Sequence, residues 1–267
     1  MSSLTVDVKA FRINLRKKLL EEAEEPVAKE APINIYINNS HVVTLFASPN
    51  HLKELGIGWL LSQGIIESIE EIREIKVRGS NVKVKCNGKV EARIKAAKIS
   101  KTIDSSCGST IENFYFLLDR ISKPIIKSEY KVGAEEILRF INTLNCMSKV
   151  FETTGGTHSA AIFEDGKLIA FAEDVGRHNA VDKVIGMAAL GKTDFSKSVL
   201  VSSGRQPANI VLKAARVGIP IIASIAAPIY SGIEAARKTG VTLICFARGQ
   251  RINVYSNPER VEIKFGD

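Results

Sequence analysis

The sequence predicts an α/β protein in which a smaller, mainly β N-terminal α+β domain precedes a C-terminal domain with parallel βαβ units. The first observation is a regular alternation of strand-like and helix-like apolar stretches after residue 198. The second is a group of short stretches with period-two alternation in the N-terminal third. The third is the composition: 45% of the 267 residues are hydrophobic and 25% are charged, which is ordinary for a globular protein and allows one large core or two modest domains.

Alternating apolar residues in the N-terminal third indicate paired strands and one helix. Asn38, Asn39 and Ser40 separate two such stretches and are typical of a hairpin link. A helix is expected to begin near residues 48–50 and to run through Leu60. Residues 1–30 include a charged stretch, to which we assign no element. The strands expected in this part are residues 33–37, 42–46, 75–78, 82–86 and 90–94.

The middle of the chain is expected to contain a loop and two helices. Residues 95–108 are expected to form the loop, and a capping box at residues 109–112, Ser-Thr-Ile-Glu, opens the first helix. A second helical pattern covers residues 133–147. We place the domain boundary here, so that residues 1–130 form the N-terminal domain and residues 131–267 the C-terminal domain.

The C-terminal domain shows repeated strand and helix patterns. A hairpin is expected first, and a helix then opens at residues 176–178. The strands that follow alternate with helices and are therefore expected to be parallel. Because parallel strands end at one edge of a sheet, the loops 202–205, 226–228 and 247–251 are expected to form a ligand crevice there. The expected strands are 159–163, 168–172, 198–201, 219–225 and 241–246, and the later helices are 207–217 and 230–238.

The charge and hydropathy of the chain indicate which kinds of partner it can have. The formal net charge is +8, which favours anionic partners, although a solvated basic face explains the charge equally well. Aromatic residues make up only 6%, so we expect no stacking platform for nucleic acid. The N-terminus lacks the order of a secretory signal, and the longest apolar run, residues 219–225, is too short to span a bilayer. We therefore expect a cytoplasmic protein without membrane contact.

The four cysteines are scattered along the chain, which argues against a disulfide framework and against a zinc site. Cys107 precedes the capped helix, where a helix N-terminus stabilises a nucleophilic thiolate. The alternative is an incidental loop cysteine. Cys86, Cys146 and Cys245 are expected to be buried. No metal site is expected.

Residues 173–183 combine acids, a glycine, an arginine and a histidine at the start of a helix. Such a cluster suits an anionic ligand, because helix N–H groups and arginine donors converge there. Asp174, Arg177, His178 and Asp182 are interpreted as too polar for a core face, and Arg177 and His178 are expected to face the same crevice as Arg248. The competing interpretation is a structural His178 bonded to Asp174.

Residues 153–158, 173–183 and 246–260 closely resemble the corresponding motifs of the formate dehydrogenase accessory protein family (FdhD), a family of sulfur carriers. The resemblance implies a cytidine deaminase-like C-terminal domain and a homodimer. It implies that the chain takes persulfide sulfur from a cysteine desulfurase and transfers it to the guanine dinucleotide form of the molybdenum cofactor. Formate dehydrogenase would be the enzyme that needs this cofactor.

The same resemblance implies site residues. Cys107 and Gly108 match the first half of the family's CGxC motif, whereas Thr110 stands where the second cysteine is expected. The segment 246–251 matches the family's site for bis-molybdopterin guanine dinucleotide, for which GDP-like nucleotides would be mimics. The cofactor-binding residues expected there are Phe246, Ala247, Arg248, Gly249, Gln250 and Arg251.

Gly204 and Arg205, in the loop after the strand 198–201, are interpreted as phosphate-binding because glycine opens access to backbone N–H groups and arginine supplies a fork. The alternative for this loop is a simple turn between a strand and a helix, and the alternative for the segment 246–251 is a basic surface loop that closes the sheet. The missing second cysteine motivates a rival function, a non-catalytic chaperone that only binds the molybdenum cofactor. Whether the chain acts as a sulfurtransferase-type enzyme stays open at this point.

Overall fold

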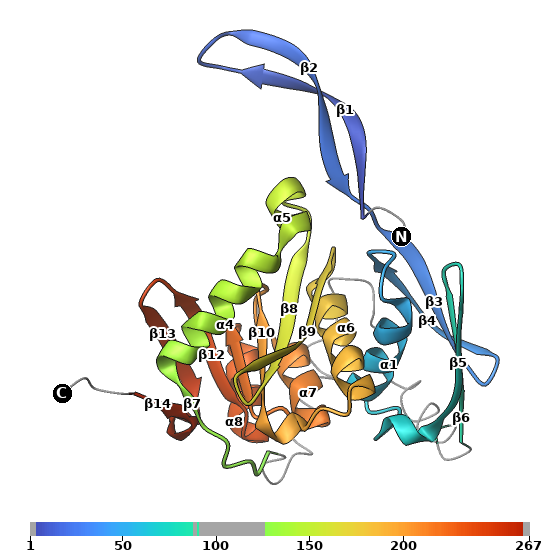
Figure 1. The fold of residues 1–267 in the computed structure, drawn as a ribbon, viewed down its shortest axis with the longest axis vertical. Coiled ribbons are helices and arrows are strands. Elements are labelled where there is room, and N and C mark those ends of the chain that lie inside the picture. Colours follow the sequence, from blue (N-terminus) through green and yellow to red (C-terminus); the bar gives the residue numbers. More distant parts are fainter. Residues whose placement is uncertain (1–3, 88–89, 91–125, 264–267) are drawn as a thin grey trace.

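The computed structural model describes residues 4–87, 90 and 126–263, and its centre is a six-stranded sheet (Figure 1). The strand order is β13-β12-β11-β10-β8-β9. β10, β11 and β12 are parallel neighbours, which confirms the predicted βαβ units, whereas β8, β9 and β13 pair antiparallel. The strands are β8 (His158–Glu164), β9 (Lys167–Asp174), β10 (Ser198–Ser202), β11 (Ile221–Ser224), β12 (Thr242–Arg248) and β13 (Arg251–Ser256).

Helices cover both faces of this sheet (Figure 1). Alternate residues of a strand point to opposite faces, and Val199 and Val201 pack in a cluster with α4, whereas Leu200 packs in the larger cluster on the other face. The structure contains every helix expected in residues 131–267, each close to its expected position. The helices are α4 (Ala134–Met147), α6 (Arg177–Leu190), α7 (Ala208–Val217) and α8 (Tyr230–Thr239), of which α4 lies alone on its face.

The N-terminal part forms a second sheet of four strands in the order β4-β3-β6-β5. The predicted hairpin of β3 and β4 is confirmed. The expected strands 75–78 and 82–86 correspond to β5 and β6, which pair antiparallel, and β3 pairs with β6 in parallel. The helix α1 (Leu52–Ser62) begins close to the expected position and packs against α6. The strands are β3 (Ala31–Ile37), β4 (Ser40–Ala47), β5 (Ile72–Arg78) and β6 (Asn81–Cys86).

Two glycines bring the backbones of α1 and α6 into direct contact. A methyl group placed on Gly58 would overlap the carbonyl group of Asp182, and one placed on Gly186 would overlap the carbonyl group of Glu54. Leu55 of α1 and Ile185 of α6 are fully buried in one continuous core cluster. The two parts of the chain therefore share a hydrophobic core.

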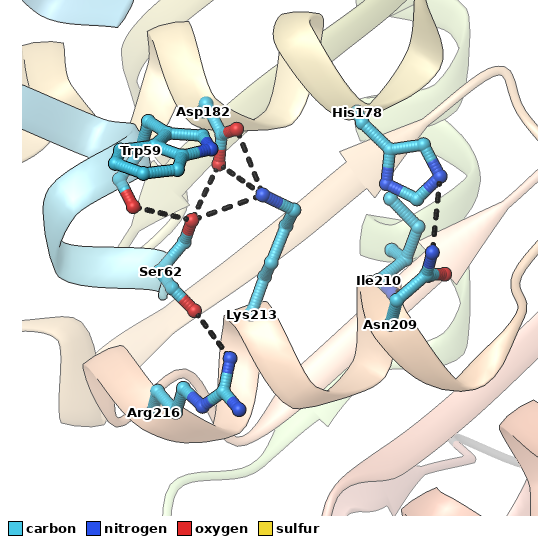
Figure 2. A network of polar contacts seen from close by, with 8 residues as sticks. All are labelled: Trp59, Ser62, His178, Asp182, Asn209, Ile210, Lys213 and Arg216. Atoms are coloured by element: carbon cyan, nitrogen blue, oxygen red, sulfur yellow. Dashed lines mark hydrogen bonds and ion pairs between the residues drawn. The ribbon is translucent and has the colours of Figure 1, made fainter. Parts of the chain in front are cut away.

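Two buried ion pairs strengthen this junction. Lys183 lies 2.6 Å from Asp174, and both side chains are 0% exposed. Lys213 of α7 lies 2.7 Å from Asp182, whose carboxylate also accepts a hydrogen bond from Ser62 of α1 (Figure 2). The interpretation of Asp174 and Asp182 as too polar for the interior was therefore wrong, because each carboxylate is neutralised by a buried lysine and hydrogen-bonded as well.

The first strands were not predicted. β1 (Thr5–Asn14) and β2 (Leu19–Ala28) form an antiparallel hairpin that extends away from the rest of the molecule (Figure 1). The predicted loop and capped helix at 95–124, and all of the strand 90–94 except Val90, lie outside the described residues. The remaining elements are α5 (Lys149–Thr154), β7 (Val132–Gly133), β14 (Val261–Glu262) and the short 3₁₀ helices Ile69–Glu71, Phe195–Lys197 and Pro258–Arg260.

Candidate functional site

The carboxyl edge of the central sheet gathers most of the polar residues that the sequence singles out. The parallel strands β10, β11 and β12 end at this edge. β8 begins there and β9 ends there, because both run antiparallel to their neighbours: Ala160 pairs with Ser202, and His158 pairs with Asp174. The helices α6 and α7 start from the same edge, so their N-terminal N–H groups add partial positive charge to it.

Ser203 joins the end of β10 to the start of β8. Its backbone N–H donates to the carbonyl of Ser159 at 2.9 Å, and its hydroxyl accepts from the N–H of Ser159 at 2.9 Å. The same hydroxyl lies 3.5 Å from Nδ1 of His158. Burial lowers the pKa of His158, and the nearby Arg177 and Arg205 lower it further. His158 is therefore a half-buried imidazole next to two cationic side chains.

Gly204 provides the contact surface for Arg177. A Cβ atom added to Gly204 would lie 2.9 Å from Cβ of Arg177 and 3.1 Å from its Cδ. The carbonyl of Gly204 accepts hydrogen bonds from Gln206 at 2.6 Å and from Ser224 at 2.8 Å, so the loop is fixed in place. Arg205 is exposed. The structure thus brings Arg177, Gly204 and Arg205 together, as a phosphate-binding loop requires.

His178, in the first turn of α6, lies beside α7, and its Nε2 is 3.4 Å from the amide nitrogen of Asn209 (Figure 2). Burial lowers the pKa of His178 to about 3, with further lowering by Lys213, Arg177 and His158. The imidazole is therefore neutral at neutral pH and supplies hydrogen bonds rather than charge. The competing interpretation, a bond to Asp174, was wrong, because the carboxylate of Asp174 is occupied by other donors.

The two acids before α6 have structural roles: Glu173 caps α5, and Asp174 fixes the turn that leads into α6. Glu173 accepts hydrogen bonds from the N–H groups of Val150 and Phe151, at the start of α5, at 3.0 and 2.8 Å. Asp174 accepts from the N–H of Gly176 at 2.8 Å, just before α6. The carboxylate of Glu173 thus satisfies N–H groups of the first turn of α5 that are otherwise unpaired. Of the charged side chains in this run, Arg177 lies at the edge of the sheet, against Gly204.

The segment 246–251 comprises the end of β12, a two-residue turn and the first residue of β13. Phe246 has a positive φ of 53°, and the strand register shifts between Cys245 and Arg248, so the strand is bulged here. Arg248 pairs with Arg251 across the turn and lies 5.7 Å from the ring centre of Phe246. Arg248, Gly249, Gln250 and Arg251 are exposed, whereas Ala247 is fully buried.

Gly249 lies at the tip of the same turn. Its φ of 61° favours glycine, and an added Cβ would have no neighbour within 4 Å. The turn therefore presents two guanidinium groups beside an open backbone.

These residues form two clusters along one edge rather than one compact site. β8 and β12 are separated by β10 and β11. With about 4.8 Å between neighbouring strands, His158 and Phe246 lie about 14 Å apart along the sheet. Arg177 and Arg205 lie near enough to His158 to lower its pKa, whereas Arg248 lies over the ring of Phe246 in the other cluster. A ligand that touches both clusters must be extended.

The cysteines differ in accessibility. Cys86 and Cys245 are buried, and burial raises their thiol pKa to about 11 and about 12, so both are protonated at neutral pH. Cys146 is exposed at the end of α4, so the expectation that it is buried was wrong. It follows Leu144 by two residues and points away from the face that α4 buries. Cys107 lies outside the described residues.

Three further residues, His158, Ser203 and Asn209, complete the cluster around Arg177. Two of them carried a signal in the sequence, because His158 ends the run 153–158 and Ser203 lies in the expected crevice loop 202–205, whereas Asn209 was not among the expected site residues. Among the described residues, no group of three potential metal ligands is found. In the same part of the chain, no helix has the length and apolar character needed to cross a membrane.

Comparisons with known proteins agree with this architecture. The FdhD/NarQ family model matches residues 28–262. A sulfur carrier protein FdhD from Wolinella succinogenes is 35% identical over 254 residues, which are 93% of this chain and 86% of the relative. One from Methanothermobacter thermautotrophicus is 35% identical over 259 residues, covering 97% of this chain and 99% of the relative.

A solved structure gives the same result for the fold. The crystal structure of a putative formate dehydrogenase accessory protein from Desulfotalea psychrophila has 31% sequence identity and a TM-score of 0.78. The match covers 97% of this chain and 100% of that chain. Both the sequence over its main body and the arrangement of its elements thus agree with one family. The chain belongs to the FdhD/NarQ family.

Proposed function

We propose that this protein is a sulfur carrier that passes sulfur from a cysteine desulfurase to the guanine dinucleotide form of the molybdenum cofactor. The observation that carries the proposal is the pair of arginine-bearing clusters along the carboxyl edge of the sheet. Relatives that are 35% identical over most of the chain are named sulfur carriers, which supports the same role here.

Cys107 is the proposed sulfur acceptor. Its thiolate attacks the terminal sulfur of the desulfurase persulfide. A new S–S bond forms on Cys107 as the donor's S–S bond breaks, and the desulfurase cysteine leaves as a thiolate. Two other cysteines of the chain, Cys86 and Cys245, are unsuitable as sulfur acceptors, because both are buried thiols with a raised pKa.

The edge residues fit a dinucleotide with a pyrophosphate. Arg248 and Arg251 supply exposed guanidinium groups, and Gly249 leaves the backbone open to close approach. Arg177, packed on Gly204, and the exposed Arg205 offer a second set of donors about 14 Å away along the sheet. An extended dinucleotide is the class of ligand that such a separation favours.

His178 has a different role in this proposal. Because its imidazole is neutral, we assign it to hydrogen bonding at the inner end of the cofactor site rather than to charge neutralisation. Phe246, Ala247 and Gln250 complete the proposed cofactor site by shaping the β12–β13 turn. GDP is the convenient mimic for binding experiments.

We also propose which part of the chain performs each task and which partners it binds. Residues 1–130 carry the sulfur on Cys107, and residues 131–267 hold the cofactor. The partners are a cysteine desulfurase, a formate dehydrogenase and a second copy of the chain, in the cytoplasm. The likeness of the C-terminal part to cytidine deaminases stays a prediction.

Mass spectrometry tests the sulfur step. The protein is incubated with a cysteine desulfurase and cysteine, and its intact mass is measured before and after reduction. We expect a reducible gain of one sulfur atom, located on Cys107 by peptide mapping and absent from Cys107→Ala. The matched control is Cys146→Ser, which removes an exposed thiol and should leave the gain unchanged.

The second candidate is a chaperone that binds the cofactor without carrying sulfur, and Thr110 in place of the second cysteine favours it. In that case Cys107→Ala restores formate dehydrogenase activity in a deficient strain as well as the wild type does. Loss of activity with unchanged GDP binding would instead reject the chaperone.

A further inference from the structure

His158 lies at the carboxyl edge of the central sheet, beside the proposed cofactor-binding residues but not one of them. It is the first residue of β8 and is half-buried. Its Nδ1 lies 3.5 Å from the hydroxyl of Ser203. Its Nε2 has no hydrogen-bond partner among the described residues and is not a fully buried atom. Nε2 is therefore the nitrogen that a ligand can reach.

Two arginines from different segments of the chain lie beside this imidazole. Ser203, Gly204 and Arg205 are consecutive, so the loop that contacts His158 also carries the exposed Arg205. Arg177, at the start of α6, packs on Gly204, where an added Cβ atom would lie 2.9 Å from Cβ of Arg177. Burial lowers the pKa of His158 most, and Arg177 and then Arg205 lower it further. His158 is therefore neutral at neutral pH, next to two cations.

The acid closest to His158 does not cancel these two charges. Asp174 lies opposite His158 on β9 and raises its pKa, but less than the other causes lower it. The carboxylate of Asp174 is 2.6 Å from the buried Lys183, which neutralises it. His178, in the first turn of α6, is itself neutral, because burial lowers its pKa to about 3. The net charge around His158 is therefore positive.

The charged groups between β9 and α5 have other partners. Glu173 accepts hydrogen bonds from N–H groups at the start of α5 and from the hydroxyl of Thr157. Lys149 and Glu152, both on α5, are exposed and pair with each other at 2.8 Å. Of the described charged groups near His158, the two arginines are therefore the ones that a bound anion would meet.

Ser203 can serve His158 in both of its protonation states. The hydroxyl oxygen accepts a hydrogen bond from the N–H of Ser159 at 2.9 Å, which leaves it one lone pair and one proton. Beside a neutral imidazole the hydroxyl donates toward Nδ1. Beside an imidazolium it accepts from Nδ1–H and turns its own proton toward the ligand edge. Protonation of His158 therefore leaves no donor at Nδ1 without an acceptor.

We propose that His158 takes up one proton when a doubly charged phosphate or pyrophosphate group binds beside Arg177 and Arg205, and that its imidazolium donates a hydrogen bond to that group through Nε2. The inference rests on the cofactor site of the proposed function, to which it adds a third cationic donor. The proton comes from solvent and adds to Nδ1, and no bond of the ligand is made or broken.

The charge of the ligand decides whether the proton is taken up. Two negative charges offset the two arginines that help to hold His158 neutral, and a nearby anion favours the imidazolium form. A singly charged anion offsets only one arginine and favours the imidazolium less. The site therefore distinguishes dianions from monoanions, and the pyrophosphate of a dinucleotide carries the two charges that it needs.

Nuclear magnetic resonance measures the pKa of His158 directly, from the pH dependence of its Cε1–H signal in the full chain. The signal is identified by its absence from His158→Gln. With saturating GDP, and with sulfate at constant ionic strength, we expect the pKa of His158 to rise by about one to three pH units. Methanesulfonate has a similar shape but one charge and should raise it less. The exposed His41 should titrate at the same pH throughout.

The affinity for GDP provides a second measurement, because coupling between a proton and a ligand is reciprocal. If GDP raises the pKa of His158 by one pH unit, protonated protein binds GDP about tenfold more tightly than neutral protein. Between about pH 6 and about pH 8, the wild type should therefore lose affinity more steeply than His158→Gln. The ionisation of GDP itself is the same in both titrations and cancels in the comparison. His41→Gln should follow the wild type.

The outcomes separate this inference from the proposed function. A pKa of His158 that neither GDP nor sulfate changes would overturn the inference, and so would equal pH dependence of GDP affinity in the wild type and His158→Gln. GDP binding without a change at His158 rejects the proton uptake and leaves the cofactor site standing. A rise with sulfate in a protein that does not bind GDP supports the inference and rejects the nucleotide as ligand. Circular dichroism shows that each variant is folded.

Discussion

The side chain of Arg177 packs on the backbone of Gly204, and this contact ties the start of α6 to the loop after β10. The space that a Cβ on Gly204 would occupy lies 2.9 Å from Cβ of Arg177. The position of the Arg177 side chain therefore depends on residue 204 having no side chain of its own. Arg205, the next residue, is exposed at the same edge.

The first prediction follows from this contact. Gly204→Ala should displace Arg177 and weaken GDP binding, because its backbone carbonyl is fixed by two hydrogen bonds and the loop cannot move aside. Calorimetric titration with GDP measures the effect. Gly133→Ala is the control, since an added Cβ there meets only one side-chain atom at 3.9 Å. If both variants bind GDP with the same affinity, Arg177 is not part of the binding site.

The second prediction concerns the exposed arginines. Replacing Arg205, Arg248 or Arg251 by Ala should lower GDP affinity at least about tenfold, because a hydrogen bond to a charged group contributes about 1.5–3 kcal/mol. Arg237→Ala removes the same charge near the end of α8, at the opposite edge of the sheet, and should leave the affinity unchanged. Unchanged affinity in all three site variants would reject the proposed cofactor site.

The third prediction concerns pH. The folded-state pKa of His178 is about 3, below its ordinary value of 6.5, so protons bind the unfolded chain more readily in this range. Stability from the neutral His178 is complete above pH 6.5 and is lost as the pH falls toward 3. The expected loss is about 1.4 kcal/mol per pH unit.

Urea unfolding at pH 7.5 and 5.5 measures this slope. His178→Gln should flatten it, and the remainder is expected to include His158, whose pKa is also lowered by burial. The exposed His41 offers the control variant His41→Gln, which should keep the wild-type slope. A slope that is the same with and without His178 would contradict a neutral buried imidazole.

The fourth prediction concerns the buried pair of Lys213 and Asp182. Lys213→Met leaves the carboxylate of Asp182 buried without its cation and should lower the free energy of unfolding by about 3–5 kcal/mol. Adding Asp182→Asn removes the stranded charge and should recover much of that loss. Chemical denaturation of the two single variants and the double variant measures the coupling. Additive losses would show that the pair contributes no interaction of its own.

The elements of the central sheet could be predicted because their apolar residues recur with one clear period. The β1–β2 hairpin was not predicted. In β2, Leu19-Leu20-Glu21-Glu22 arranges apolar and acidic residues in pairs rather than in alternation, although in β1 Val6, Val8 and Ala10 do alternate with polar residues. Pro26 near the end of β2 also argues against a strand, although it is tolerated in a hairpin with free edges. The pattern of an edge hairpin without a buried face carries little information about its conformation.

The polar run 173–183 shows why the site was only partly predictable. Its sequence does not reveal that Asp174 meets the N–H of Ser48, or that Asp182 meets Ser62, because these partners lie 126 and 120 residues away. Side chains that suit a ligand and side chains that suit a buried ion pair are of the same type. Only the fold separates Arg177, at the edge, from the aspartates in the interior.

The glycine contact between α1 and α6 has a consequence for motion. Because Gly58 and Gly186 let the two backbones touch, neither helix can slide or rotate past the other without driving atoms into a carbonyl group. We therefore expect the two sheets to move as one body, so that changes at the carboxyl edge of the central sheet are limited to its turns and side chains. The amide hydrogens of both helices should exchange with solvent as one cooperative unit.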